Sequence, residues 1–353
     1  MVIKQTVKSQ KGEVEFRKKL YKQQVEGQEI FSDEFDVDGI QRILADRMQI
    51  TKEQISALKK SGLAISPYLE IGAERGQRSL VMENDLQASG IAADLSFDML
   101  KSADHYSKIF DKAKLPLRVC CDINNLPFLS NSIPFVFCYD TLHHFPDPTP
   151  AIAEVERVLA PGAYFFFGQE PYKKVAHINL YNGAKVYSKK ALGFGKLRKI
   201  LDYFLAERIG NEIEHGIIEN EEIHISDWKK LLNIFSEKKV QLQSLNKISV
   251  DLYGKKNYFK YFLNYLLGGN IFGTVRKLGD GVDLNLKRED FIICPNCLKT
   301  GQEIKLCQQE SDWFCSHCHS NFPVVDGVIF LLANDKFEEL YPEIYGHNFS
   351  SVV

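Results

Sequence analysis

Two pairs of cysteines carry the clearest chemistry in the sequence. Cys294 and Cys297 flank Pro-Asn, Cys315 and Cys318 flank Ser-His, and 17 residues separate the two pairs. Two C-x-x-C knuckles at this distance are typical of a tetrahedral zinc site, in which four thiolates leave no coordination position for a reacting water. The sequence therefore predicts one structural Zn²⁺ held by these four cysteines.

A glycine turn after an apolar segment indicates a second site. Tyr68-Leu-Glu-Ile leads into Gly72, and Gly76 opens a helical pattern. Glycine lets the backbone pass close to a ligand, and the first turn of a helix offers unpaired N–H groups. The spacing Glu70-x-Gly72-x-x-x-Gly76 fits the dinucleotide fingerprint poorly. An acid ahead of the turn also favours a cationic ligand over a pyrophosphate, because like charges repel.

Two more acids follow later strands of the same pattern. Asp94 ends the second predicted strand, where a carboxylate can accept both ribose hydroxyls, and Asp122 ends the third, near the place of an adenine amino group. The carboxyl ends of parallel strands meet at one edge of a sheet, and ligands bind there. A glycine turn alone indicates no more than a bend, but three acids at one edge predict a ligand site.

The elements that position these residues alternate along the chain. Strand patterns occur at 67–72, 91–95, 117–123, 134–141 and 163–169, with helical patterns between them at 77–88, 97–110 and 150–159. Strands separated by helices predict βαβ units and a parallel sheet. The expected fold class is therefore α/β, with a doubly wound, mostly parallel, Rossmann-like sheet.

The rest of the chain differs from this core. Residues 172–290 are aromatic, with helical patterns, and carry 21 Lys and Arg against 14 Asp and Glu, a net charge of +7. A capped helix and an added strand are expected at 226–245, and Phe291-Ile-Ile as the last strand of the sheet. The expected organisation is an N-terminal helical cap at 1–62, a cofactor-binding core at 63–171, a helical acceptor region at 172–290, a zinc ribbon at 291–335 and a polar tail at 336–353.

Four segments of the core resemble one enzyme family. They are the glycine turn, Asp94-Leu-Ser-Phe-Asp-Met-Leu, Asp122-Ile-Asn-Asn-Leu-Pro-Phe, and Leu142-His-His-Phe-Pro-Asp-Pro with Glu154-Val-Glu-Arg-Val-Leu-Ala-Pro-Gly. In this order they resemble class I methyltransferases, of the subgroup typified by ubiquinone and menaquinone biosynthesis enzymes. The resemblance implies S-adenosylmethionine as methyl donor. It places Glu70, Gly72 and Gly76 at the methionine end, Asp94 at the ribose and Asp122 with Ile123 at the adenine, with Leu95 and Tyr139 as further cofactor contacts.

Three residues depart from the family pattern. Glu74 stands where the family usually has its middle glycine, so a side chain lies on the binding loop. Pro134 stands where an Asp usually begins the fourth strand, and Ala163 replaces the second glycine after Pro161. We expect the first departure to bear on cofactor affinity and the other two to affect only packing.

Candidates for a general base follow the fourth strand. His143 and His144 lie beside the expected methyl donor, with Asp140 close by, and a histidine can accept a proton near neutral pH. The alternative is that the histidines only shape the loop. Methyl transfer gains much of its acceleration from positioning, so a base is needed only when the nucleophile keeps its proton.

The C-terminal segment resembles a second family. Asn321-Phe-Pro-Val-Val-Asp-Gly-Val-Ile-Phe-Leu-Leu, together with the cysteines, is similar to small zinc-ribbon proteins that activate certain tRNA, rRNA and protein methyltransferases. Phe291-Ile-Ile joins the ribbon to the sheet without a linker. We therefore expect the ribbon to dock rigidly through Val328-Ile-Phe-Leu-Leu, to stabilise the catalytic domain and to border its acceptor pocket.

Composition limits the partners. The net charge of −2 gives no global attraction to nucleic acid or anionic membranes. Residues 1–25 lack an apolar signal segment, and the apolar stretch Tyr258 to Phe272 is too short to span a bilayer. That stretch is interpreted as core packing, with an apolar substrate wall or membrane-surface contact as alternatives. Paired cysteines that bind metal indicate a reducing cytoplasm.

Three functions remain open. The favoured one is a methyltransferase for a small-molecule, lipid-like or glycan-like acceptor, with the middle segment as acceptor pocket and the N-terminal helices as lid. The second is an RNA methyltransferase, supported by the ribbon and the basic middle segment but not by the overall charge. The third is a non-catalytic subunit, supported only by Glu74.

Overall fold

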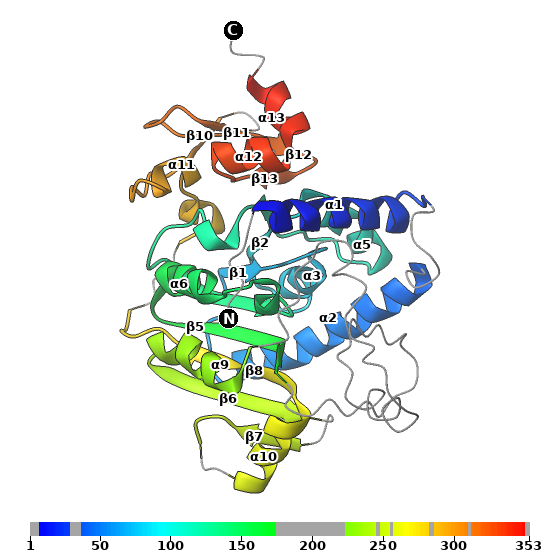
Figure 1. Cartoon of the computed structure of the whole chain (residues 1–353). Coiled ribbons are helices and arrows are strands. Elements are labelled where there is room, and N and C mark those ends of the chain that lie inside the picture. The colour runs from blue at the N-terminus through cyan, green and yellow to red at the C-terminus, as the bar shows by residue number, and fades with distance from the viewer. Residues whose placement is uncertain are drawn as a thin grey trace, which may run out of the picture.

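A computed structural model of the chain describes residues 7–28, 37–173, 223–244, 248–254, 257–281, 286–309 and 312–349. Its centre is a ten-stranded sheet with flanking helices (Figure 1). The strand order is β12-β13-β3-β2-β1-β4-β5-β8-β6-β7. None of the helices in these ranges combines the length and the apolar character that crossing a membrane requires.

The parallel core of the sheet confirms the expected fold class. It consists of β1 (Tyr68–Ile71), β2 (Gly90–Asp94), β3 (Leu117–Cys120), β4 (Ile133–Tyr139) and β5 (Leu159–Tyr172). Successive side chains of a strand point to opposite faces. Val136 and Cys138 accordingly belong to one hydrophobic cluster, and Phe135 and Phe137 to another. Burial on both faces explains why these strands are nearly continuous apolar runs.

Helices cover both faces of the core. The first face packs against α6 (Thr149–Val158) and α9 (Ile225–Leu231), and the second against α2 (Val37–Lys60) and α3 (Gln77–Asn84). The helix expected at 97–110 is divided at Ser102 into α4 (Phe97–Lys101) and α5 (Ala103–Ile109). Helix α1 (Val7–Gln24) packs on α4 and on the C-terminal helix α12 (Asn334–Leu340).

The sheet continues beyond β5 with antiparallel strands. β8 (Gly269–Arg276) pairs with β5, then β6 (Glu237–Ser244) with β8 and β7 (Ile248–Asp251) with β6. The helix and added strand expected at 226–245 are thereby confirmed as α9 and β6, although the helix follows His224 and not Ser226.

The expectation of a helix-rich region at 172–290 is wrong for the part that the structure describes. That part holds three strands, α9 and α10 (Tyr258–Leu267), while residues 174–222 lie outside the described ranges. The interpretation of α10 as core packing is also wrong, because Phe259 is 71% exposed and Phe262 56%. Helical periodicity alone does not tell which face of a helix the fold covers.

The C-terminal segment adds a strand where none was expected. Phe291 ends a short 3₁₀ turn, and Ile292 and Ile293 make isolated bridges with Phe128 and Lys305, so this segment is not the last strand of the sheet. Instead β13 (Val328–Phe330) pairs parallel with β3, and β12 (Val324–Val325) forms the edge beyond it. The cysteine-bearing part has its own short elements, namely α11 (Pro295–Leu298), β9 (Cys307–Gln309), β10 (Asp312–Phe314) and β11 (Asn321–Phe322).

The segment expected as a polar tail is helical. It forms α12 and α13 (Pro342–Phe349). Phe337, Leu340 and Tyr341 are buried against the core, at helical spacing within an otherwise polar sequence. A few apolar residues three and four positions apart are enough to attach a helix to a surface.

Candidate active site

One cavity of about 440 Å³ lies at the carboxyl edge of the parallel strands. Its walls come from α1 and α2 as well as from the strand ends. Most of the residues expected in the site line it: Gly72, Asp94, Leu95, Asp122, Ile123, Tyr139, Asp140, His143 and His144. Glu70 and Gly76 are the two expected residues that do not.

The glycine turn has the backbone that its sequence suggests. Gly72 and Gly76 both have φ near +66°, and a Cβ on Gly72 would overlap the side chain of Thr141. Position 72 therefore requires glycine, because its left-handed backbone conformation disfavours a side chain and Thr141 leaves no room for one. Gly76 precedes α3, whose N-terminus the turn directs toward the cavity edge.

Glu70 lies behind the turn and not in the cavity. Its side chain is buried and accepts a hydrogen bond from Ser79 Oγ of α3 at 2.5 Å. Burial raises the pKa of Glu70 to about 8. In this structure the residue supports the turn from beneath.

Asp94 faces the cavity in a fixed orientation. Its carboxylate accepts the backbone N–H of Glu74 at 2.8 Å and that of Ser96 at 2.8 Å. Burial raises the pKa of Asp94 to about 6 despite these two donors. The hydrogen bonds join the glycine turn after β1 to the turn after β2, so that both loops present one surface.

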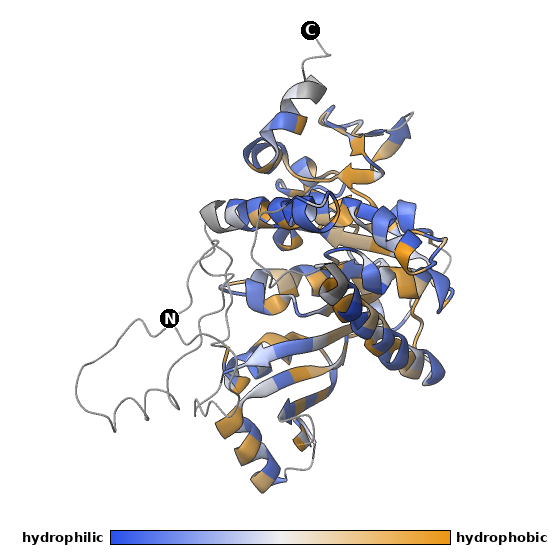
Figure 2. Cartoon of the chain, turned by 90° about the vertical axis from the view of Figure 1, so that its right-hand side faces the viewer, coloured by the Kyte–Doolittle hydropathy of each residue, from blue (hydrophilic) through white to orange (hydrophobic). Residues whose placement is uncertain are grey.

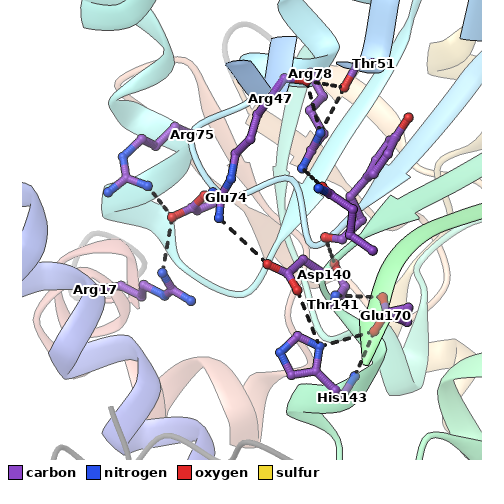
Figure 3. Close-up of polar contacts among 12 residues, drawn as sticks. Arg17, Arg47, Thr51, Glu74, Arg75, Arg78, Asp140, Thr141, His143 and Glu170 are labelled. Atoms are coloured by element: carbon purple, nitrogen blue, oxygen red, sulfur yellow. Dashed lines mark hydrogen bonds and ion pairs between the residues drawn. The ribbon is translucent and has the colours of Figure 1, made fainter. Parts of the chain in front are cut away.

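The side chain of Glu74 is engaged by three arginines. Its carboxylate lies 3.2 Å from Arg17 of α1, 3.1 Å from Arg47 of α2 and in contact with Arg75 (Figure 3). Burial acts to raise the pKa of Glu74, but Arg75, Arg17 and Arg47 together hold it well below its usual range. The residue that replaces the family's glycine therefore ties the binding loop to both N-terminal helices.

Glu170 is a site residue that the sequence interpretation missed. It follows the apolar core of β5, is fully buried and accepts the backbone N–H groups of Thr141 at 2.8 Å, Leu142 at 3.0 Å and His143 at 3.2 Å. Burial acts to raise its pKa, but His143 and the backbone donors lower it. The signal that could have identified it is an acid near the end of the fifth strand of the core, in addition to those at the ends of the first three.

Glu170 also orients the imidazole of His143. His143 Nδ1 lies 3.2 Å from Glu170 Oε2 and 3.9 Å from Asp140 Oδ1 (Figure 3). An ionised carboxylate only accepts hydrogen bonds, so Nδ1 carries the hydrogen and Nε2 keeps its lone pair. A histidine held in this way can accept a proton from a ligand in the cavity. The ring of His144 packs on that of His143, with 4.1 Å between the centroids.

Tyr139 connects the fourth strand to α2. The guanidinium of Arg78 lies 3.9 Å from the centroid of its ring, and its hydroxyl donates to Gln54 at 2.9 Å. Arg78 also donates to Thr51 at 2.9 Å. These contacts fix α2 over the cavity.

The four expected zinc ligands meet at one point. The Sγ atoms of Cys294, Cys297, Cys315 and Cys318 all lie within 4.8 Å of one another. The Cys294–Cys318 distance is 3.4 Å and the Cys297–Cys315 distance 3.7 Å. Thiolates about 2.3 Å from a tetrahedral ion lie at such separations, so this donor set fits Zn²⁺.

Comparison with known proteins identifies the core. A family model described as a methyltransferase domain matches residues 69–167. Two Arabidopsis thaliana proteins, both named uncharacterised chloroplastic methyltransferases, are 40% identical over 90 and 78 residues, which cover 24% and 21% of this chain. The chain spans 25% and 22% of the length of these relatives.

Solved structures align over more of the chain at lower identity. A Methanosarcina mazei protein described as a SAM-dependent methyltransferase is 19% identical, covering 63% of this chain and 98% of that one, with a TM-score of 0.40. A Haemonchus contortus phosphoethanolamine N-methyltransferase solved with S-adenosylhomocysteine is 16% identical, covering 64% and 52%, with a TM-score of 0.37. From the family model and the two plant relatives we conclude that residues 69–167 are a methyltransferase domain.

Proposed function

We propose that the chain transfers a methyl group from S-adenosylmethionine to a small-molecule acceptor. The observation that carries this proposal is the cavity at the carboxyl edge, where Gly72, Asp94 and Asp122 meet within the matched domain. When bound, S-adenosylmethionine would supply a methyl group on a positively charged sulfur: a nucleophile would attack the methyl carbon, and S-adenosylhomocysteine would leave. The chain would bind the cofactor, align it and take up the proton that the nucleophile releases.

The residues present suit such a cofactor. We assign the backbone of the turn from Gly72 to Gly76, supported by Glu70, to the methionine end. Asp94 and Leu95 would contact the ribose, and Asp122 and Ile123 the adenine, as the resemblance implies. Tyr139 would line the side nearest the methyl group.

The acceptor would lie between α2 and the loop after β4. Ile40, Ile43 and Leu44 of α2 line the cavity together with Phe145. Charged side chains, Arg47 and Asp140 among them, line the same cavity, and such a mixture suits a small organic molecule with apolar and polar parts. Among the described residues, the N-terminal helices thus supply more of this wall than the middle segment does.

His143 is the residue we assign to proton transfer. Glu170 keeps the Nδ1 hydrogen in place, so Nε2 accepts the proton from an acceptor hydroxyl or amine as the new bond to the methyl group forms, and passes it to solvent. Asp140 Oδ1 lies 3.9 Å from His143 Nδ1, and the same carboxylate pairs with Arg47 at 3.7 Å. We therefore assign Asp140 to orienting the His143 ring. His144 packs beside His143 and would shape the loop.

We further propose that Cys294, Cys297, Cys315 and Cys318 hold one Zn²⁺. A shell of four thiolates leaves no open position, so the ion would be structural. An RNA acceptor remains the second candidate, because the sequence of residues 172–290 carries a net charge of +7. Binding that weakens steeply with salt would favour RNA over a small molecule.

Titration calorimetry with S-adenosylhomocysteine tests the proposal. We expect the wild type to bind, and Asp94→Ala to lose about 1.5–3 kcal/mol of binding free energy, the range for a hydrogen bond to a charged group. Absence of heat at millimolar ligand would mean that Glu74 has closed the site, and the proposal would be wrong.

The pH dependence of binding provides an independent check. The pKa of Asp94 is raised to about 6, so its carboxylate is ionised above that pH and protonated below it. Protonation removes acceptor capacity, and affinity for S-adenosylhomocysteine should therefore fall as the pH drops through about 6. Asp94→Asn cannot titrate and should lose this step; a step that persists in the variant would assign it to another group.

A further inference from the structure

The C-terminal helices reach the wall of the cofactor cavity. After β13 has paired with β3, Leu331 N donates to Cys120 O at 2.9 Å, which extends the pairing to the end of β3. Asp122 follows two residues after Cys120. The chain then turns into α12, which packs on α1 (Figure 1). Residues more than 200 positions apart thus lie together at the expected adenosine end.

Tyr341 holds the turn that carries Asp94. Its hydroxyl donates to Leu95 O at 2.7 Å and accepts the backbone N–H of Phe97 at 3.0 Å. The residue between them is Ser96, whose N–H binds the Asp94 carboxylate. The Tyr341 side chain is buried among Phe97, Phe330 and Phe337, so its hydroxyl has a fixed position. The Tyr341 hydroxyl therefore holds Leu95 and Phe97, the two neighbours of Ser96, and Ser96 in turn orients Asp94.

Lys336 holds the carboxylate of Asp122. Its Nζ lies 2.9 Å from Asp122 Oδ2, and Gln10 of α1 donates to the same oxygen at 3.3 Å. A second cavity of about 210 Å³ begins on the other side of Asp122 and is lined by Lys336 and Leu331. Asp122 lines both cavities, and Lys336 and Gln10 hold its carboxylate where the two linings meet.

The start of α12 is fixed to the first cysteine knuckle. Asn296, which lies between Cys294 and Cys297, donates to Asn334 Oδ1 at 2.9 Å and accepts the backbone N–H of Asn334 at 2.9 Å. The same amide donates to Ser320 Oγ beside the second knuckle at 2.8 Å. Helix α12 is therefore attached at one end to the cysteine cluster and, through Lys336, to Asp122.

We propose that Lys336 and Tyr341 are positioning residues of the cofactor site, supplied by the C-terminal segment. Tyr341 aims Asp94 at the ribose through the Leu95–Phe97 turn, and Lys336 holds Asp122 where it meets the adenine. The inference rests on the proposed function, because it assigns a role to residues around the same cavity. Because α12 carries Lys336, cofactor affinity should also depend on how firmly the hydrogen bonds between Asn296 and Asn334 fix α12 to the ribbon.

The test measures S-adenosylhomocysteine affinity by calorimetry on the full-length, zinc-loaded protein. Lys336→Met and Tyr341→Phe should each bind about tenfold more weakly than the wild type, because each removes hydrogen bonds that position the carboxylate of Asp122 or of Asp94. Lys336→Arg keeps the charge and should restore most of the affinity. Lys230→Met is the matched control, since Lys230 pairs with Asp227 on the exposed side of α9 and lines neither cavity.

Melting temperature and zinc content, measured on the same samples, distinguish positioning from stability. A variant that melts at a lower temperature but binds as tightly as the wild type would overturn the proposal. Tighter binding by Lys336→Met would also overturn it, because Lys336 would then compete with the adenine for Asp122. If Tyr341→Phe does not fold, Lys336→Met and Lys336→Arg decide alone. If the wild type and the Lys336 and Tyr341 variants all bind S-adenosylhomocysteine equally well, only this inference is refuted. If the wild type does not bind it, the proposed function is refuted as well.

Discussion

The two edges of the central sheet use aromatic residues in opposite ways. At the β12 edge, Phe330 and Phe337 are buried and join β13 and α12 to the core. At the β7 edge, α10 exposes Phe259 and Phe262 and buries a polar residue, Asn264. Figure 2 shows α10 at the lower end of the molecule as a largely hydrophobic helix.

The difference lies in what fixes each helix. Asn264 accepts the hydroxyl of Tyr172 at 2.8 Å and donates to Ile248 O at 3.1 Å, so hydrogen bonds attach the inner side of α10. Helix α12 is attached by apolar packing together with Lys336 and Asn334. A hydrophobic helix is therefore not necessarily a core helix, and a polar C-terminal sequence is not necessarily a tail.

Removal of the whole attachment at the β12 edge should have the largest effect. A chain that ends at Asp290 loses β13 and α12, and exposes the apolar edge of β3 and the α4 surface. We expect it to melt about 10 °C lower or more, and to bind a hydrophobic dye. If the shortened chain keeps its melting temperature and still binds S-adenosylhomocysteine, the ribbon is an independent module and the RNA or protein-partner alternative gains support.

Loss of the metal should have the next largest effect. Cys315→Ser removes one thiolate, and a small metal domain folds on its metal. We expect metal analysis to find one zinc per wild-type chain and none in the variant, with a lower melting temperature than wild type but a higher one than the chain ending at Asp290. Zinc retained in the variant would show that the ligands are assigned wrongly.

At the β7 edge, replacing one polar residue of α10 should destabilise the protein more than replacing two of its phenylalanines. Asn264→Ala leaves the buried hydroxyl of Tyr172 without its partner and should cost about 1–3 kcal/mol of unfolding free energy. Phe259→Ser with Phe262→Ser removes two large side chains from the exposed surface and should cost no more than about 0.5 kcal/mol for each. Urea unfolding measures both, and a double phenylalanine variant less stable than Asn264→Ala would mean that this face is covered.

Local sequence patterns were sufficient for the parallel core. Tyr68-Leu-Glu-Ile before Gly72, and the apolar runs that end at Asp94 and near Asp122, specify strand, turn and edge without reference to distant residues. Parallel strands are buried on both faces, so their composition is distinctive at short range. The cysteine knuckles were equally clear, because four thiolates at fixed spacing serve few other purposes.

Glu170, Lys336 and Tyr341 could not be assigned in the same way. Each acts on a partner 27 or more positions away, and its role depends on which strands become neighbours. Val328-Ile-Phe was expected to cover apolar surface, but its pairing with β3 is a backbone interaction that side-chain patterns do not encode. The site contacts that follow from this pairing were therefore not predictable.

The sequence by itself determined the fold class, the methyltransferase domain and the composition of the cysteine cluster, because hydrophobic periodicity and ligand spacing act over short distances. Only the tertiary structure decided that Glu74 pairs with three arginines, that Glu170 orients His143 and that Lys336 of α12 contacts Asp122 in the cavity wall. Charges and hydrogen bonds act where groups meet in space, and that meeting depends on strand order and helix packing. The same physical reason explains why the aromatic residues of α10 face outward while those of α12 are buried.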